Sequence, residues 1–159
     1  MAMQMGGPEA QPVCPRDAAP LPPELAGWES RKPMTAATDG ASLAGATLAP
    51  GAAVDLVLPP TPAVTYVLRP SRPGGSVSHG GMAKVVIGDA GTYRVAIGSA
   101  AWIDVVKDGI SLESVAHGHG PACSGVRKMV DFALQPGSYV LQIVGNGAAT
   151  LPLTIVKLP

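Results

Sequence analysis

The sequence predicts an all-β fold, an antiparallel β-sandwich resembling a jelly roll and built from about nine strands. The first observation behind this prediction is a series of short runs in which apolar and polar side chains alternate. The second is that turn signals rich in glycine and proline separate these runs at about 8 to 12 residues, which is typical of sandwiches and barrels. The third is that no segment shows a convincing apolar repeat at the helical spacing of about 3.6 residues.

The first two predicted strands lie between prolines. Apolar side chains alternate over residues 54–58, and Pro59-Pro60 ends this run because proline lacks the backbone donor that a strand ladder needs. Residues 64–68 alternate in the same way and end before Pro70. Both segments are therefore expected to be short strands.

Glycine turns bound the middle strands. An apolar run over residues 82–87 precedes a turn, and residues 93–97 alternate after it. Residues 101–107 and 110–115 flank Asp108-Gly109, in which both residues tolerate a positive φ. This arrangement predicts a β-hairpin.

The last three predicted strands follow the same pattern. Residues 130–134 alternate up to the turn at Pro136-Gly137, and residues 139–144 run on to Gly145-Asn146-Gly147. Residues 151–156 then form the final strand. Residues 91–115 and 137–157 each read as a strand, a glycine turn and a second strand, which predicts two meander hairpins.

The chain divides by composition into two parts. Of its 17 prolines, 13 lie at or before Pro73, so residues 1–40 are expected to be an irregular leader and strap without a regular ladder or helix. Residues 41–159 are expected to be a single β-sandwich domain. Trp28, one of two tryptophans, is expected to dock on this core, whereas Met1 to Pro12 looks like an added or processed terminus.

Charge and hydropathy exclude several classes of partner. The formal net charge of the 159 residues is zero, which gives no long-range attraction to nucleic acid or to an anionic membrane. No window of 18 successive apolar residues is present, so no transmembrane segment is expected. The remaining partners are a small molecule or another protein, with the oligomeric state left open.

Two cysteines, Cys14 and Cys123, are predicted to form one disulfide. The alternatives are two free thiols or a thiolate metal ligand at Cys123. A disulfide would indicate an oxidising compartment, the periplasm or the cell exterior. The sequence lacks a complete signal peptide, and an exported protein would have had its signal removed.

The three histidines carry the main chemical signal. His117 and His119 form a His-x-His pair in a glycine-rich segment, and an extended backbone would place both rings on one face. His79 lies in a second glycine-rich segment and would complete a three-histidine site. Such a site would hold one divalent transition metal ion, Zn, Cu or Fe, with an open coordination position. A pocket that uses these histidines without metal, and histidines in ordinary loop tips, are the alternatives.

Basic residues follow the histidine pair closely. Arg127 and Lys128 are predicted to be ligand-binding residues, because an arginine can hold a carboxylate or phosphate through two hydrogen bonds. The alternative for Arg127 is an ion pair with Asp131 or a hydrogen bond to a loop carbonyl. Asp104 alternates in phase with Trp102, which predicts an inward-facing carboxylate with a buried polar partner. The alternative for Asp104 is to accept a hydrogen bond from a histidine N–H.

Two resemblances extend this picture. Residues 91–158, with Gly-x-Tyr strand openings at Tyr93 and Tyr139 and a final hairpin, resemble small exported bacterial β-sandwich modules of the pre-peptidase C-terminal type. Residues 21–28, 72–81 and 116–132 resemble a family of small exported bacterial proteins of uncharacterised function.

That family implies export, a Cys14–Cys123 pairing and a histidine-centred site, with no established reaction. Some of its members carry a homogentisate 1,2-dioxygenase label. Enzymes with that activity are far longer and use a cupin site with two histidines and a glutamate. This chain departs from them in length and lacks a matching glutamate motif.

Three functions are therefore considered. The first is an exported protein with a histidine-centred, metal-binding site. The second is a β-sandwich module that binds a ligand or a protein without catalysis. The third is a small metal-dependent oxygenase or hydrolase, for which Asp104, Glu113 and Asp131 are the nearby carboxylate candidates. Whether the protein is an enzyme is left open by the sequence.

Overall fold

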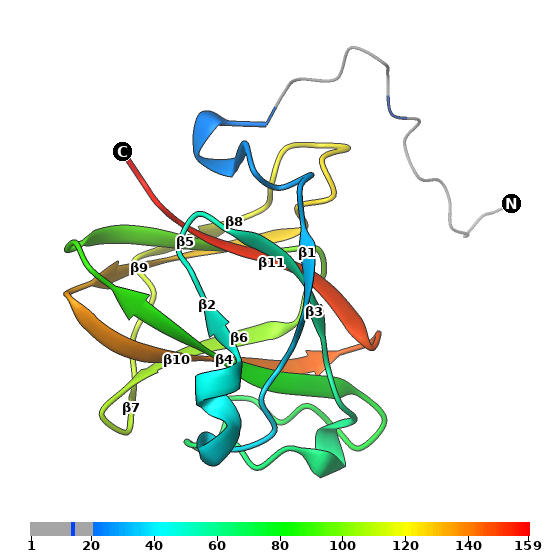
Figure 1. Ribbon diagram of the computed structural model, residues 1–159. Helices are drawn as coiled ribbons and strands as arrows, with labels where there is room; N and C mark the ends of the chain where they lie inside the picture. The colour runs from blue at the N-terminus through cyan, green and yellow to red at the C-terminus, as the bar shows by residue number, and fades with distance from the viewer. Residues whose placement is uncertain (1–13, 15–20) are drawn as a thin grey trace, which may run out of the picture.

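The computed structural model describes Cys14 and residues 21–159 and folds them into two β-sheets packed face to face (Figure 1). This confirms the predicted all-β sandwich. The six-stranded sheet contains, in order across it, β1 (Lys32–Thr35), β3 (Ala53–Val57), β11 (Thr150–Lys157), β5 (Gly91–Ile97), β9 (Lys128–Leu134) and β8 (Ala116–Gly118). The five-stranded sheet contains β2 (Thr47–Leu48), β4 (His79–Ile87), β10 (Gly137–Asn146), β6 (Trp102–Lys107) and β7 (Ile110–Ser111). Short 3-10 turns are η1 (Pro23–Leu25), η2 (Gly40–Gly45) and η3 (Thr61–Ala63).

The core lies between the two sheets, where alternate side chains of each strand meet. On β6, Ile103 and Val105 belong to this core, so Trp102 and Asp104 point to the other face of the same sheet. Asp104 is buried as predicted, but it does not face the core between the sheets. The alternation over residues 54–58, 93–97, 130–134, 139–144 and 151–156 produces strands for the same reason. The predicted meander hairpins are wrong, however, because β5 and β6, and likewise β10 and β11, belong to different sheets.

Two strand pairs are parallel, which corrects the prediction of an antiparallel sandwich. β1 runs parallel to β3, and β2 runs parallel to β4, at the edges of the two sheets. Parallel neighbours need a crossover connection. The chain provides it because β1, β2, β3 and β4 belong alternately to one sheet and to the other.

The prediction that the first forty residues form no ladder is wrong at β1. Residues 32–35 pair with β3, and Pro33 stands opposite Asp55. Proline is tolerated here because β1 is the last strand of its sheet, so one side of its backbone needs no partner.

The prediction of a strand over residues 64–68 is also wrong. This segment crosses the outer face of the five-stranded sheet, where the Tyr66 hydroxyl donates to the Ile143 carbonyl over 2.6 Å. The backbone of Leu68 pairs with a side chain instead of a strand. Its N–H donates to Gln142 Oε1 over 3.2 Å, and its carbonyl accepts from Gln142 Nε2 over 3.0 Å.

The predicted strand over residues 110–115 ends after Ser111. Leu112 still donates its N–H to the Val105 carbonyl, but Val115 donates to the Asp131 carbonyl in the opposite sheet. The chain therefore crosses from one sheet to the other over residues 112–115. It then forms β8, a strand that the sequence pattern did not predict.

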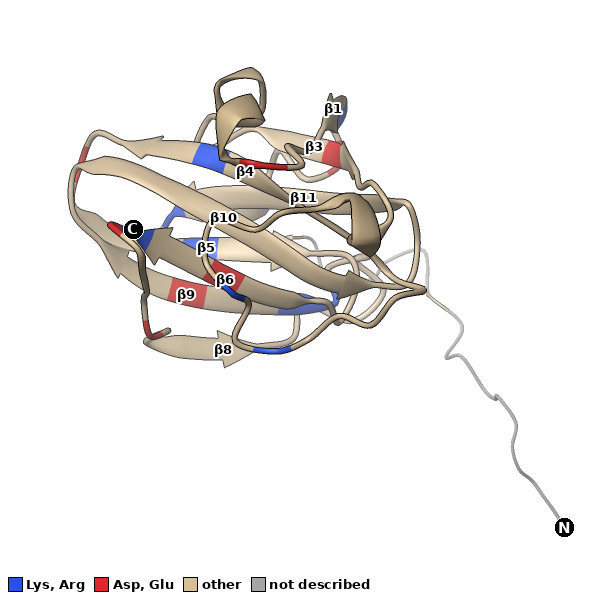
Figure 2. Ribbon diagram, turned by 90° about the horizontal axis from the view of Figure 1, so that it is seen from below, with Lys and Arg blue, Asp and Glu red and all other residues tan. Residues whose placement is uncertain are grey.

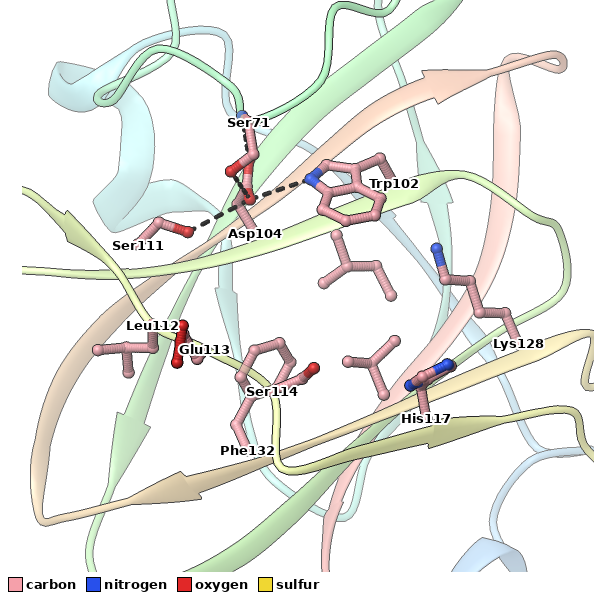
Figure 3. Close-up of a pocket in the computed structure, with 12 residues that line it drawn as sticks. Ser71, Trp102, Asp104, Ser111, Leu112, Glu113, Ser114, His117, Lys128 and Phe132 are labelled. Atoms are coloured by element: carbon pink, nitrogen blue, oxygen red, sulfur yellow. Dashed lines mark hydrogen bonds between the residues drawn. The ribbon is translucent and has the colours of Figure 1, made fainter.

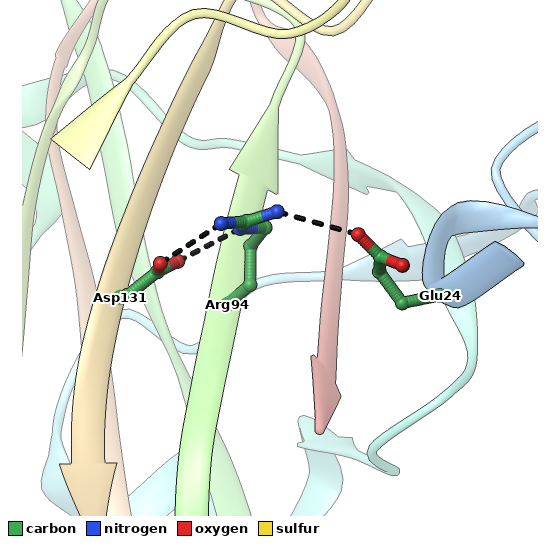
Figure 4. A network of polar contacts seen from close by, with 3 residues as sticks. All are labelled: Glu24, Arg94 and Asp131. Atoms are coloured by element: carbon green, nitrogen blue, oxygen red, sulfur yellow. Dashed lines mark hydrogen bonds and ion pairs between the residues drawn. The ribbon is translucent and has the colours of Figure 1, made fainter. Parts of the chain in front are cut away.

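The strap docks on the outer face of the six-stranded sheet, as expected for Trp28. This indole is 2% exposed and packs with Leu25, Val126, Ala96 of β5 and Val156 of β11. A partly buried ion network holds the same region (Figure 4). Arg94 donates to both oxygens of Asp131, over 2.8 and 2.9 Å, and reaches Glu24 of the strap at 3.4 Å.

Cys14 and Cys123 form the predicted disulfide, with their Cα atoms 5.5 Å apart. The bond spans 109 positions of sequence and joins the strap to the loop between β8 and β9. Figure 1 shows that loop beside the strap. Residues 1–13 and 15–20, including the predicted terminal leader Met1 to Pro12, lie outside the described residues.

Charged residues are sparse and scattered over strands of both sheets, with most of the ribbon coloured as uncharged (Figure 2). In the part of the chain that the structure describes, no helix reaches the length and hydropathy needed to cross a membrane.

Candidate functional site

A pocket of about 770 Å³ lies where the β6–β7 edge of one sheet faces the β8–β9 edge of the other (Figure 3). It exists because β7 pairs with only the last two residues of β6, which leaves the start of β6 without a strand on that side. Residues 112–115 cross in front of this gap. The lining residues are Ser71, Trp102, Ile103, Asp104, Ser111, Leu112, Glu113, Ser114, His117, Lys128, Val130 and Phe132.

The floor of the pocket is apolar. Ile103, Val130 and Phe132 belong to the core between the sheets, and Leu112 packs against that core. The pocket therefore opens directly onto the hydrophobic interior. An apolar group that entered it would leave water, which is favourable by about 25 cal/mol per Å² of apolar surface buried.

Asp104 organises the polar end of the pocket. Its Oδ1 accepts from Ser71 Oγ over 2.7 Å, from Trp102 Nε1 over 3.0 Å and from Ser111 Oγ over 3.3 Å. Its Oδ2 accepts from the backbone N–H of Ser71 over 3.1 Å. The four donors come from three segments of the chain, so this carboxylate, 3% exposed, fixes the loop around residue 71 and the Trp102 ring.

Replacing Asp104 with alanine should destabilise the fold by about 1–3 kcal/mol, because it leaves the Ser71 N–H and the Trp102 indole N–H without their acceptor. Urea unfolding followed by circular dichroism measures this change, and the emission of Trp102 should shift with it. S111A, which removes the longest of the four bonds, should cost less than D104A. Equal stability of D104A and the wild type would contradict the anchoring role.

Two cations share the Trp102 ring. The Arg72 guanidinium carbon lies 4.8 Å from the ring centroid, and the Lys128 Nζ lies 5.1 Å from it, both within cation–π range. Lys128 also donates to the Ala101 carbonyl over 2.9 Å. Burial, and secondly the charge of Arg72, lower the pKa of Lys128 below its ordinary value of 10.5. The charged form of the Lys128 amine is therefore less stable, relative to the neutral form, than in an exposed lysine.

A smaller pocket of about 240 Å³ adjoins these residues, and it brings together four of the predicted site residues. It is lined by Ala100, His117, Gly118, His119, Arg127 and Lys128. His119 Nδ1 lies 3.1 Å from the Arg127 carbonyl oxygen. Because a carbonyl only accepts, this contact assigns the proton to Nδ1.

His79 does not join the other two histidines. It begins β4 opposite Asn146, and its Nδ1 is buried without a hydrogen-bond partner among the described residues. Among those same residues, no three His, Cys, Asp or Glu side chains are placed to hold a metal ion. The predicted cluster of three histidines is therefore not seen, and Cys123 is committed to its disulfide. The binding of a divalent metal ion stays a prediction.

The remaining carboxylate candidates lie in different surroundings. Asp131 pairs with Arg94 on the outer face of the six-stranded sheet, so it is not the ion-pair partner of Arg127. Glu113 is exposed at the mouth of the larger pocket. Only Glu113 of these two lines a pocket.

Sequence reasoning missed Ser71 and Arg72 as parts of the site. They reach Asp104 and Trp102 across about thirty positions of sequence, and no local motif marks such a contact. The alternation that predicted a buried Asp104 was the signal available, since a buried carboxylate required polar partners from elsewhere in the chain.

Comparison with known proteins gives no assignment for this site. No protein-family model matches the chain, and no curated protein is significantly similar to it.

Proposed function

We propose that this protein is an exported β-sandwich module that binds a small, largely apolar molecule in the larger pocket. The observation that carries the proposal is a hollow of about 770 Å³ whose floor belongs to the hydrophobic core and whose rim is polar. Ligand pockets in proteins commonly have about 300–1,000 Å³ and this same mixture of apolar walls with a few placed polar groups.

Binding without catalysis is favoured by the state of the carboxylates. Asp104 accepts four hydrogen bonds, and Asp131 is paired with Arg94, so neither is free to take a proton from a substrate. A general base must reach the reacting proton directly or through one water. Glu113, the third candidate, is exposed at the mouth of the pocket, away from the end that carries Lys128, so we assign the polar groups around Asp104 to orienting a ligand.

Export is supported by the disulfide between Cys14 and Cys123, since such bonds persist in oxidising compartments and are rare in the cytosol. The apolar character of the pocket fits a carrier or sensor of a poorly soluble small molecule in such a compartment.

The test uses N-phenyl-1-naphthylamine, an uncharged fluorophore whose emission rises in apolar surroundings. We expect saturable binding to the wild type at one site. S114W fills the mouth of the pocket and should weaken binding at least about tenfold, which corresponds to about 1.4 kcal/mol. S30W places the same indole on an exposed turn of the strap and is the matched control.

Circular dichroism and thermal unfolding would establish that both variants fold. Absence of saturable binding to the wild type would overturn the proposal. Equal affinity of the wild type and the folded S114W variant would show that the dye binds elsewhere, and this result would also overturn it.

A further inference from the structure

The two pockets meet at a pair of residues. His117 and Lys128 line both of them, while Arg127 and His119 line the smaller pocket alone. A molecule in the apolar pocket would therefore present one end to this basic group.

The smaller pocket is basic and has no acidic counterpart. Its lining contains two cations and two imidazoles and no carboxylate. Across the described residues, no carboxylate lies within ion-pairing distance of Lys128 or Arg127, and the described ion pairs of the chain involve other arginines. The positive charge in this pocket is thus not compensated locally.

The acidic groups of the larger pocket do not compensate the positive charge of Lys128 and Arg127. Asp104 is held by its four donors at the far side of the Trp102 ring, and Figure 3 shows Glu113 across the pocket from Lys128. The site is polarised, with its acidic groups away from the end that carries Lys128 and His117.

The Lys128 ammonium also stands close to a second cation, Arg72, over the same indole. Their repulsion and the burial of Lys128 lower the pKa of this amine. An anion beside Lys128 would offset both effects, because a nearby opposite charge favours the protonated amine.

We propose that the ligand is an amphipathic carboxylate, with its head group in the smaller pocket between Lys128 and Arg127 and its apolar body in the larger pocket against Trp102, Val130 and Phe132. This inference rests on the proposed function. It adds the chemical class of the ligand, a molecule with an anionic end and an apolar end.

The experiment compares three probes that share one apolar chain: decanoate, decanol and decylamine. Each probe is titrated against the complex of the protein with N-phenyl-1-naphthylamine, and displacement of the dye is measured. The emission of Trp102 is followed in parallel in a W28F background, where Trp102 is the remaining tryptophan. We expect decanoate to bind at least about tenfold more tightly than decanol, and decylamine to bind most weakly.

The preference should depend on the local cations. In the double variant K128Q/R127Q, decanoate and decanol should bind with equal affinity. K32Q/K157Q is the control with the same loss of charge, because both lysines are exposed and neither lines a pocket. It should keep the preference for decanoate.

Raising the pH from about 7 to about 10 should weaken decanoate binding and leave decanol binding unchanged, since Lys128 loses its proton at a lower pH than an ordinary lysine. The other charged or titratable groups around this amine are Arg72, Asp104, Glu113, His117, His119 and Arg127. K128R keeps its charge over this range and should bind decanoate without the loss, which separates the amine from these neighbours.

Each outcome has one meaning. If the dye and decanol bind but decanoate binds no better, the pocket function stands and the carboxylate inference fails. If decanoate is preferred equally by the wild type and K128Q/R127Q, the inference also fails. If neither the dye nor any of the three probes binds, the proposed function itself fails.

Discussion

Replacing Trp28 with alanine should destabilise the protein by about 3–5 kcal/mol, the largest loss we expect from a single side chain. The indole is 2% exposed and fills the contact between the strap and the six-stranded sheet, against Leu25, Ala96 and Val156. Its removal leaves a cavity that the short side chains around it cannot close.

The same substitution removes a cation–π contact, since the Arg31 guanidinium carbon lies 5.1 Å from the Trp28 ring centroid. Arg31 in turn donates to the Trp28 carbonyl and to Asp55 of β3, each over 2.8 Å. The docking of the strap is therefore tied to the pairing of β1 with β3.

Urea unfolding measured by circular dichroism gives the free energy of unfolding, and limited proteolysis reports release of the strap. W28F keeps an aromatic ring and should lose less than W28A. A loss below about 1 kcal/mol in W28A would show that the strap contributes little to stability.

Loss of the disulfide should be the second largest effect, about 2–4 kcal/mol. The bond closes a long segment, because the cysteines stand 109 positions apart, and in the chain-entropy model the stabilisation grows with the length of the closed loop. Reduced protein should therefore unfold at a lower urea concentration than oxidised protein.

C14S and C123S should lower the free energy of unfolding by the same amount if the disulfide alone determines the loss. Cys123 has a φ of 63°, in the left-handed region that most side chains avoid, and serine at this position is held in the same conformation. A larger loss in C123S than in C14S would assign the difference to the loop around residue 123. Equal stability of the reduced and oxidised wild type would contradict the prediction.

The strands were predictable wherever one face of a strand is buried. The alternation of Tyr93, Val95 and Ile97 places these side chains in the core, and the same rule held for residues 130–134 and 151–156. The rule failed at residues 64–68 because Gln142 satisfies the backbone of Leu68 in place of a neighbouring strand. This hydrogen bonding depends on one side chain more than seventy positions away, and a pattern read along the local sequence carries no information about it.

The site was predictable only in part. His117, His119, Arg127 and Lys128 were predicted as functional residues from their proximity in the sequence, and the structure groups them around one small pocket. His79 was expected to join them because histidines are rare in this chain, but its place is fixed by the pairing of β4 with β10. The larger pocket depends on the crossing of residues 112–115 between sheets, a tertiary feature that alternation along a strand does not encode.

The shortness of the edge strands has a consequence for self-association. Edge strands are the places where folded β-proteins add further chains and aggregate. Here the outermost strands β2 and β7 have two residues each, β8 has three and β1 has four, one of them proline. The long strands β4 and β10, of nine and ten residues, have neighbours on both sides. In a chain that is 47% apolar in composition, the outermost strands thus offer an incoming strand only short ladders, and the start of β6, which β7 leaves uncovered, is the free edge where an added strand would be expected to pair.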